Sequence, residues 1–214
     1  VVVFLSQDIN NHIIVTGRNE MALKSLSDRS SNIHPVTSDI SIPDDLKGTF
    51  TDKIFRHFKS VDVLINIAGA LVSKEFMEIE DKEARLMMET NFFGTAAVIR
   101  MVKPLMPEGS HIVNISSMGG FQGSVKFKGL AYYSASKAAI ACLSECLAEE
   151  FKDSGISVNC LALGAVQTEM LGEAFPGYKA PVETVEIAPF ICYFALNCHK
   201  FMNGKIIPVA VNNP

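Results

Sequence analysis

Short runs rich in β-branched residues alternate with amphipathic stretches along almost the whole chain. This alternation is typical of a parallel sheet covered by helices. Several runs are apolar without a break, as expected of strands buried on both faces. The expected strands are Val1–Leu5, His12–Thr16, His34–Thr37, Val61–Ile67, His111–Ile115, Ser157–Leu163 and Lys205–Val209. The expected helices are Glu20–Leu26, Leu46–Phe58, Lys82–Leu105, Tyr133–Lys152 and Val182–Leu196. The sequence therefore predicts an α/β fold.

The chain has 214 residues, which is enough for one domain with a sizeable core, and no internal repeat, low-complexity tract or long linker interrupts it. We therefore expect a single domain over residues 1–214. Hydrophobic residues make up 48% and charged residues 20%, which is a globular rather than a disordered balance. A net charge of -4 argues against nucleic acid as the main partner.

Several other classes are excluded by what the sequence lacks. It contains no apolar stretch of the roughly 18 residues that would span a bilayer, and the opening VVVFLS is too short for a signal-peptide core. We expect no membrane partner. The five cysteines form no CxxC pair, and their odd number fits a reducing cytoplasm. The five histidines have no metal-site spacing, so no metal is expected.

One connection near the start departs from the pattern. Only residues 7–11 separate the first expected strand from the next. Neighbouring parallel strands need a crossover of roughly 10–12 residues or more, usually a helix. Either the two strands form an antiparallel hairpin, or a segment is absent between Ser6 and Gln7. We favour the absent segment, because a glycine-rich phosphate loop belongs at this junction in a dinucleotide-binding fold.

The sharpest local feature is the segment AYYSASKAA, in which Tyr133 and Lys137 stand four residues apart at the start of an expected helix. This spacing places both side chains on one face of the helix. A lysine ammonium beside a phenol stabilises the phenolate and lowers a pKa that is otherwise about 10. Such a tyrosine exchanges protons near neutral pH, as a reaction at an alcohol or carbonyl carbon requires. Taken alone, the pair is more often a chance pair on a helix surface.

Three further residues give the pair a setting. Ser117 ends the buried strand in HIVNISS, and ligands of open α/β sheets bind outside the carboxyl ends of strands. Its hydroxyl is placed to bond either a substrate carbonyl or the backbone of its own turn. Gly69 follows the strand in LINIAGA and permits a close backbone approach to a ligand. Asn91 lies in the apolar helix METNFFG, where asparagine is unfavourable unless its amide has a partner.

Taken in order, these segments resemble the short-chain dehydrogenase/reductase family over nearly the whole chain. The matching motifs are TGRN, SDI, NIAG, the helical Asn91, NISS, YSASK and GAVQTEM. Each is modest alone, and their order makes the resemblance specific. It leans toward bacterial 3-oxoacyl carrier-protein reductases. It implies a single-domain, doubly wound Rossmann-type fold, with a seven-stranded parallel sheet and helices on both faces.

The resemblance also implies a catalytic tetrad of Asn91, Ser117, Tyr133 and Lys137. Tyr133 would donate a proton to the oxygen of a substrate carbonyl while NADP(H) delivers hydride to its carbon, and Ser117 would orient that oxygen. Lys137 would lower the tyrosine pKa and hold the nicotinamide ribose, while Asn91 would anchor a water. Ser116 is a weaker candidate than Ser117, since successive strand residues face opposite ways.

Cofactor contacts follow from the same resemblance. An acid after the second strand of a Rossmann fold binds the ribose of NAD, whereas an arginine favours the 2′-phosphate of NADP. This chain has Arg18 there and then Asn19, so NADP(H) is favoured over NAD(H). The implied cofactor-binding set is Arg18, Asn19, Asp39, Ile40, Asn66, Ala68, Gly69, Tyr133, Lys137, Gly164, Val166 and Thr168. The TGxxxGxG phosphate loop of the family is missing from the sequence.

The residues around the expected substrate cleft leave its substrate open. The insertion FQGSVKFKG lengthens the interval between Ser117 and Tyr133. A turn-rich lid is expected from LGEAFPGYKAPVETVEIA, with Phe175 and Tyr178 as apolar contacts and Lys179 as an anion contact. The substrate is expected to be a small carbonyl or alcohol, with a 3-oxoacyl thioester as one candidate.

Two functional classes remain. One is an active reductase or alcohol dehydrogenase; the other is a catalytically silent NADP-binding sensor or scaffold, which the missing phosphate loop keeps open. Retention of the whole tetrad favours the enzyme. A hydrolase using Ser117 has no histidine base near in sequence and no GxSxG turn. The helices Lys82–Leu105 and Tyr133–Lys152 are apolar beyond one face, so we expect a homodimer or homotetramer.

Overall fold

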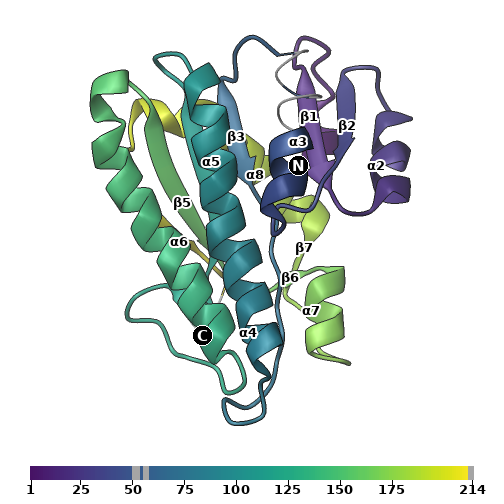
Figure 1. The fold of residues 1–214 in the computed structure, drawn as a ribbon, viewed down its shortest axis with the longest axis vertical. Coiled ribbons are helices and arrows are strands. Elements are labelled where there is room, and N and C mark those ends of the chain that lie inside the picture. Colours follow the sequence, from purple (N-terminus) through teal and green to yellow (C-terminus); the bar gives the residue numbers. More distant parts are fainter. Residues whose placement is uncertain (50–53, 55–57, 212–214) are drawn as a thin grey trace.

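Parallel strands run through the middle of the molecule with helices on either side (Figure 1). The computed structural model describes every residue except 50–53, 55–57 and 212–214. The strands are β1 (Ile13–Gly17), β2 (Ile33–Thr37), β3 (Val63–Asn66), β4 (His111–Ser117), β5 (Ser157–Leu163), β6 (Val166–Gln167), β7 (Val182–Glu183) and β8 (Ile206–Val209). The helices are α1 (Val2–Leu5), α2 (Glu20–Ser27), α3 (Pro43–Thr49), α4 (Asp81–Met88), α5 (Thr95–Val102), α6 (Ala131–Glu150), α7 (Glu169–Ala174) and α8 (Thr184–Asn197).

The main sheet has the order β3-β4-β5-β8, and all its neighbouring strands are parallel. Strands β1 and β2 form a separate parallel pair, as do the short strands β6 and β7. The register pairs Asn66 with Asn114 and Ser117 with Leu163, so the carboxyl ends of β3, β4 and β5 lie at one edge. Residues that follow these strands are therefore brought together.

The predicted Rossmann-type α/β architecture is confirmed, but the predicted seven-stranded sheet is not found. Among the described residues, the largest sheet has four strands. The main error concerns Val1–Leu5, which was expected to be a strand. Residues Val2–Leu5 form the helical turn α1 instead, with the Ser6 N–H donating to the Val2 carbonyl at 2.9 Å. Val1 packs on the cluster that contains Ile191 of α8, so tertiary packing outweighs the β propensity of valine.

Because Val2–Leu5 is helical, the short connection after Ser6 does not have to cross between two parallel strands. Residues 7–12 join a helix to a strand, and such a connection is commonly short. The segment is held by its own bonds: the Asn11 amide donates to the Leu5 carbonyl at 2.9 Å, and the Asn32 amide donates to the Asp8 carbonyl at 3.0 Å. The absence of a segment between Ser6 and Gln7 therefore stays a prediction. The strand at Val1–Leu5 on which it was based is not present.

The other expected elements are present with small shifts of their ends. The expected helix over 82–105 is one continuous run in which α4, a π-helix (Glu89–Gly94), α5 and a 3-10 turn (Lys103–Leu105) follow each other. Helix α6 starts two residues early, at Ala131, and α8 starts at Thr184, because Val182 and Glu183 belong to β7. Part of the expected helix Leu46–Phe58 lies outside the described residues; its described part, α3, begins at Pro43.

The π-helix places a glycine against a neighbouring segment. A Cβ on Gly94 would lie 2.5 Å from the carbonyl oxygen of Ile40, so only glycine permits this close backbone approach. Ile40 follows β2, which means that the contact joins the α4–α5 run to the β1–β2 pair. Single π-turns within helices occur frequently at functional sites. Here the π-turn contains Asn91.

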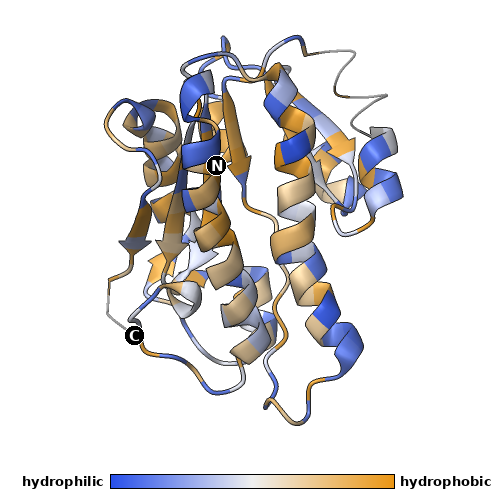
Figure 2. Ribbon diagram, turned by 60° about the vertical axis from the view of Figure 1, so that its left-hand side comes forward, coloured by the Kyte–Doolittle hydropathy of each residue, from blue (hydrophilic) through white to orange (hydrophobic). Residues whose placement is uncertain are grey.

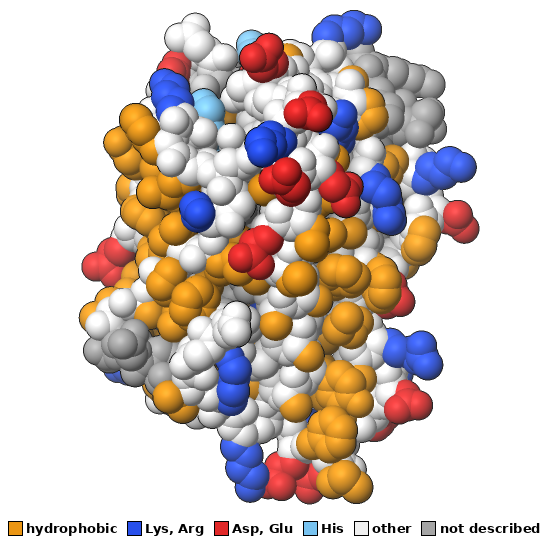
Figure 3. All heavy atoms as spheres, turned by 90° about the vertical axis from the view of Figure 1, so that its left-hand side faces the viewer, with side chains coloured by type: hydrophobic (Ala, Val, Ile, Leu, Met, Phe, Trp, Pro, Cys, Tyr) orange, Lys and Arg blue, Asp and Glu red, His pale blue; other side chains and the backbone are white. Residues whose placement is uncertain are grey.

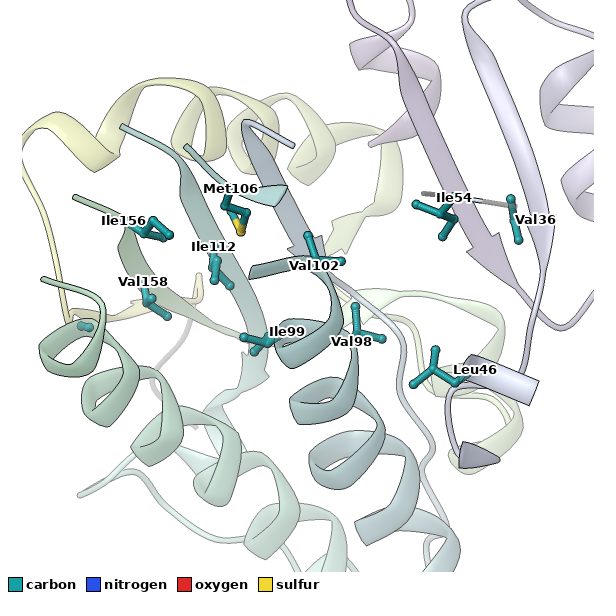
Figure 4. Close-up of a cluster of buried hydrophobic side chains, with 11 residues drawn as sticks. Val36, Leu46, Ile54, Val98, Ile99, Val102, Met106, Ile112, Ile156 and Val158 are labelled. Carbon is teal, nitrogen blue, oxygen red and sulfur yellow. The ribbon is translucent and has the colours of Figure 1, made fainter. Parts of the chain in front are cut away.

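Two apolar clusters bury the faces of the main sheet. Ile112 of β4 and Val158 of β5 pack with Ile99 of α5 on one face (Figure 4). Val113 and Leu161, at positions of the same strands that point the other way, pack on the other face with α8. Helices α5 and α6 thus cover one face and α8 the other (Figure 1), and the strands themselves are mostly hydrophobic (Figure 2). Burial on both faces explains why these strands read as unbroken apolar runs.

A histidine is buried at the amino end of β4. His111 has no solvent exposure, and its Nδ1 lies 2.8 Å from the Ala195 carbonyl oxygen. Since a carbonyl only accepts, Nδ1 carries the hydrogen and Nε2 accepts from the Asn159 amide at 2.9 Å. Burial lowers the pKa of His111 to about 4, against a smaller opposing effect of its bond to Ala195. The neutral ring therefore satisfies both of its nitrogens.

Candidate active site

Four side chains meet beyond the carboxyl ends of β3 and β4. Ser117 is the last residue of β4, Tyr133 and Lys137 lie in the first turns of α6, and Asn91 lies in the π-helix. Gly69, in the loop after β3, is the place where two of them converge. A Cβ there would lie 3.3 Å from Asn91 Oδ1 and 3.4 Å from Lys137 Nζ. The structure thus brings together all four residues that the sequence singled out for catalysis.

The amide of Asn91 is fully engaged. Its Oδ1 accepts from the Ala70 N–H at 2.7 Å, and its Nδ2 donates to the Ala70 carbonyl at 2.9 Å and to Ser136 Oγ at 2.8 Å. Asn91 is 1% exposed, so its polar atoms would be costly to leave unpaired. Its side chain ties the loop after β3 to helix α6. That tie fixes the distance between Gly69 and Lys137.

Tyr133 and Lys137 are both buried, at 8% and 4% exposure. Lys137 Nζ donates to the Ile115 carbonyl at 2.9 Å and lies 6.0 Å from the centre of the Tyr133 ring. Burial lowers the pKa of Lys137 to about 8, and the neighbouring Cys160 raises it slightly against that effect. An ammonium with a pKa near 8 is charged at neutral pH and loses its proton in mildly alkaline solution.

The tyrosine pKa shifts in the opposite direction from the sequence-based expectation. Burial raises the pKa of Tyr133, and its hydrogen bond with Ser117 only partly opposes this. The physical reason is desolvation, because Tyr133 packs among Met87, Leu130 and other apolar side chains while the lysine ammonium is bonded to a backbone carbonyl. Tyr133 therefore holds its proton at neutral pH. It is suited to donate that proton rather than to accept one.

The two neighbouring serines point to different sides of β4. Ser117 Oγ accepts from the Gly119 N–H at 3.1 Å, and the Ser117 hydroxyl lowers the pKa of Tyr133 against the larger effect of burial. Ser116 Oγ instead donates to the Lys137 carbonyl at 2.6 Å and is buried beneath α6. This is the alternation expected along a strand. Ser117 faces the tyrosine hydroxyl, and Ser116 fastens the backbone of α6 to the sheet.

A row of polar side chains beneath the site was missed in the sequence. The Asn66 amide donates to Asn114 Oδ1 at 2.8 Å, and the Asn114 amide donates to Ser144 Oγ at 2.8 Å. Ser144 Oγ then donates to the Ile140 carbonyl at 2.7 Å. The row crosses from β3 through β4 to α6 and fixes α6 along its axis. The available signal was Asn114, a polar residue inside an otherwise apolar strand. Asn66, expected to line a cofactor cleft, uses its amide within the sheet.

The residues expected near the adenosine end of a dinucleotide follow β1 and β2. The Arg18 guanidinium is 63% exposed and lies 3.9 Å from the Asp39 carboxylate. Asn19 caps helix α2, since its Oδ1 accepts from the Ala22 N–H at 3.0 Å. Asp39 Oδ1 accepts from the Ser41 N–H at 2.9 Å, so Asp39 is also bonded within its own loop. Such an exposed ion pair is weak.

The remaining predicted residues follow β3 and β5 in sequence. Ala68 is exposed in the loop after β3, and Val166 is half-buried in β6. Gly164 approaches Ala210 so closely that a Cβ would lie 2.8 Å from the alanine Cβ. Thr168 caps α7, its Oγ1 accepting from the Leu171 N–H at 3.1 Å. Gly164, Val166 and Thr168 connect the end of β5 to the segment that was expected to form a lid.

Comparison with known proteins identifies the family. A family described as short chain dehydrogenase matches residues 3–179. The chain belongs to this family. An uncharacterised oxidoreductase of Staphylococcus aureus is 28% identical over 202 residues, which cover 92% of this chain and 85% of that protein. A relative from Staphylococcus epidermidis, also an uncharacterised oxidoreductase, is 27% identical over 184 residues, covering 85% and 78%.

Solved structures of the family share the fold. A short-chain dehydrogenase/reductase from Brucella melitensis, named as a glucose/ribitol dehydrogenase, has a TM-score of 0.87 at 22% identity, covering 100% of this chain and 90% of its own. ElxO, solved with NADP bound, has a TM-score of 0.81 at 25% identity, covering 98% and 91%. As a short chain dehydrogenase, the protein is an oxidoreductase of a family that uses nicotinamide cofactors.

The residues present fit the two ends of such a cofactor. The Lys137 ammonium has three N–H donors and uses one of them for the Ile115 carbonyl, so two remain that could bond ribose hydroxyls. Arg18 supplies an exposed guanidinium at the other end. The sequence contains no TGxxxGxG motif for the pyrophosphate. Within the described residues, no cluster of three or more histidines, cysteines or acids could hold a metal ion, and no helix is long and apolar enough to cross a membrane.

Proposed function

We propose that this short chain dehydrogenase is an NADP(H)-dependent enzyme that reduces a carbonyl or oxidises the corresponding alcohol. The observation that carries the proposal is that Ser117, Tyr133, Lys137 and Asn91 meet beyond the carboxyl ends of β3 and β4, with Asn91 and Lys137 converging at Gly69. A protein that only senses the dinucleotide has no evident need for a buried tyrosine beside a buried lysine. The apolar surroundings of Tyr133 support a 3-oxoacyl thioester or a similar carbonyl compound as the substrate.

Each of the four side chains has its own role in the proposed proton transfer. A nicotinamide dinucleotide, when bound, supplies or takes up hydride at the substrate carbon. Ser117 orients the substrate oxygen by donating a hydrogen bond to it, and Tyr133 transfers its phenolic proton to that oxygen. The Lys137 ammonium stabilises the phenolate that remains. Asn91 holds the loop at Gly69 and thereby keeps the lysine in place.

The charge of Lys137 predicts a pH profile. Because burial lowers its pKa to about 8, the ammonium that stabilises the phenolate is lost as the pH rises above about 8. We expect kcat/KM for reduction to fall roughly tenfold per pH unit beyond that point, since one proton is lost. In Lys137→Arg the guanidinium does not titrate in this range. Its residual activity should therefore lack the break near pH 8, and an unchanged break would assign the titration to another group.

Arg18 predicts the choice between the two dinucleotides. We expect Arg18→Ala to weaken NADPH binding by roughly tenfold or more, the scale of one charge-assisted contact. NADH binding should change little, because NADH lacks the 2′-phosphate. Calorimetric titrations of both dinucleotides measure this, with the exposed Arg29→Ala of the neighbouring loop as a charge-matched control. An unchanged ratio of the two affinities would remove Arg18 from phosphate recognition. NADPH binding without any turnover would favour the silent sensor.

We also propose a homodimer or homotetramer formed through the helices that carry the site. Leu86 and Phe93 are 38% and 49% exposed on the α4–α5 run, and Cys142 and Cys146 are exposed on α6. Figure 3, which views the α6 side, shows apolar side chains gathered across the middle and lower part of this face. Contiguous apolar surface of this kind is typical of a protein interface.

The five cysteines are all free, which supports a reducing, cytoplasmic location.

A further inference from the structure

A group of exposed apolar side chains borders Tyr133. Phe76 and Met77 follow β3 in sequence and are 61% and 89% exposed, and Phe127, in the insertion before α6, is 46% exposed. Tyr132 lies half-buried beside them. We call these four residues, Phe76, Met77, Phe127 and Tyr132, the apolar shelf. Single exposed apolar residues are ordinary, but several on neighbouring loops indicate a binding surface.

Backbone and side-chain contacts fix the shelf. The Lys74 N–H donates to the Gly129 carbonyl at 3.1 Å, and the Lys128 ammonium lies 2.6 Å from the Glu75 carboxylate. These contacts hold the loop that carries Phe76 against the loop that carries Phe127. The Phe76 ring stacks on Tyr132, with ring centres 5.6 Å apart and planes at 10°. The shelf is therefore built by two loops that are tied together.

The shelf continues inward to Tyr133. Tyr132 packs on the buried cluster of Met87, Leu130 and Tyr133. The other side chains packed on that cluster are equally apolar, namely Leu71, Val72, Ile79 and Phe175. Phe175 comes from the segment after α7 that was expected to cover the substrate. Apolar side chains from the loop after β3, the start of α6 and the lid segment thus pack on the cluster that contains Tyr133.

The three lysines of these loops are each bonded to a nearby group. Lys74 pairs with Glu83, and Lys128 pairs with Glu75. The Lys126 ammonium donates to the Phe121 carbonyl at 2.7 Å and to Ser124 Oγ at 2.8 Å. The ammonium groups of these three lysines are therefore bonded within the protein. A substrate with many hydroxyl groups would lose hydrogen bonds to water against such a surface, and that loss is costly.

We propose that the substrate carries an extended apolar chain or ring next to its carbonyl, and that the apolar shelf binds this part while Tyr133 faces the carbonyl oxygen. The inference rests on the proposed function and adds the class of substrate to it. Phe76 and Tyr132 form the stacked platform, and Phe175 packs on the buried cluster beneath it. Met77 follows Phe76 on the same loop, and Phe127 lies on the loop that is tied to it. Phe127 of the insertion thereby helps to select the substrate, whereas the tetrad carries out the proton transfer.

A series of methyl ketones of increasing chain length tests the shelf, with NADPH oxidation as the readout. We expect kcat/KM to rise up to roughly fourfold with each buried methylene, which corresponds to about 0.8 kcal/mol. Phe76→Ser and Met77→Ser should flatten this dependence on chain length. Phe201→Ser is the matched control, because Phe201 is 82% exposed and follows the turn after α8. It should keep the full dependence.

Two further measurements separate the possible failures. Calorimetric binding of the longest soluble ketone to the Tyr133→Phe variant reports on the shelf without turnover. If the Tyr133→Phe variant binds the ketone tightly and the added Phe76→Ser substitution weakens that binding, the shelf is supported. This holds even if Tyr133→Phe reduces ketones as fast as the parent protein, which would show the proposed chemistry to be wrong. A flat chain-length series in the parent protein, or an unchanged series in Phe76→Ser, overturns the shelf. Dissociation of an oligomer by Phe76→Ser with an unchanged series also overturns it, and assigns these side chains to a subunit contact.

Discussion

Replacing Tyr133 by phenylalanine is expected to lower kcat/KM for carbonyl reduction by about 100- to 10,000-fold, the range that one positioned proton donor contributes. The loss arises because the phenolic hydroxyl, whose pKa the Ser117 hydroxyl lowers, is the group that would reach the substrate oxygen. Phenylalanine keeps the ring that packs on Met87 and Leu130, so the folded structure should persist. NADPH oxidation at saturating cofactor measures the effect.

The adjacent tyrosine provides the control. Tyr132→Phe removes a hydroxyl from a half-buried ring that stacks on Phe76 and has no lysine one turn on. We expect this variant to retain activity and to unfold at the same temperature as Tyr133→Phe. Equal rates in the parent protein and in Tyr133→Phe would reject Tyr133 as the proton donor. Equal losses in both variants would point to packing rather than to proton transfer.

Acidification is expected to destabilise the fold through His111. Its pKa is about 4 in the folded chain, against 6.5 for an exposed histidine. The unfolded chain therefore binds the proton more readily between pH 6.5 and 4, and the free energy of unfolding falls as the pH falls through this window. The full contribution is present above pH 6.5, and about 3 kcal/mol is lost by pH 4. Urea unfolding at several pH values measures this loss.

The bonding of the ring defines the variant to compare. Protonation places a second N–H at Nε2, where it meets the Asn159 amide instead of accepting from it. Glutamine has both a donor and an acceptor and does not titrate, so His111→Gln should show a shallower loss of stability with acid. His12→Gln, at an exposed position, should behave like the parent protein. An acid response in His111→Gln as steep as in the parent would assign the effect to other groups.

The order of the motifs was readable from sequence because each depends on local spacing. Tyr133 and Lys137 share a helix face whenever their segment is helical, and Ser117 ends a strand that its apolar run already marks. The first residues were not readable in this way. Val1–Leu5 has the composition of a strand, but it forms a helical turn against α8. Strand propensity reports how well a residue fits a pleated surface, and no strand among the described residues pairs with this segment.

The sequence by itself determined the family, the α/β architecture and the identity of the four candidate catalytic side chains. It determined them because chain connectivity and residue spacing survive without knowledge of the environment. Only the tertiary structure decided the protonation of Tyr133 and Lys137, the engagement of the Asn91 amide and the row from Asn66 to Ser144. These properties depend on burial and on contacts between distant segments. Desolvation raises the tyrosine pKa that the spacing of Tyr133 and Lys137 alone had suggested would fall.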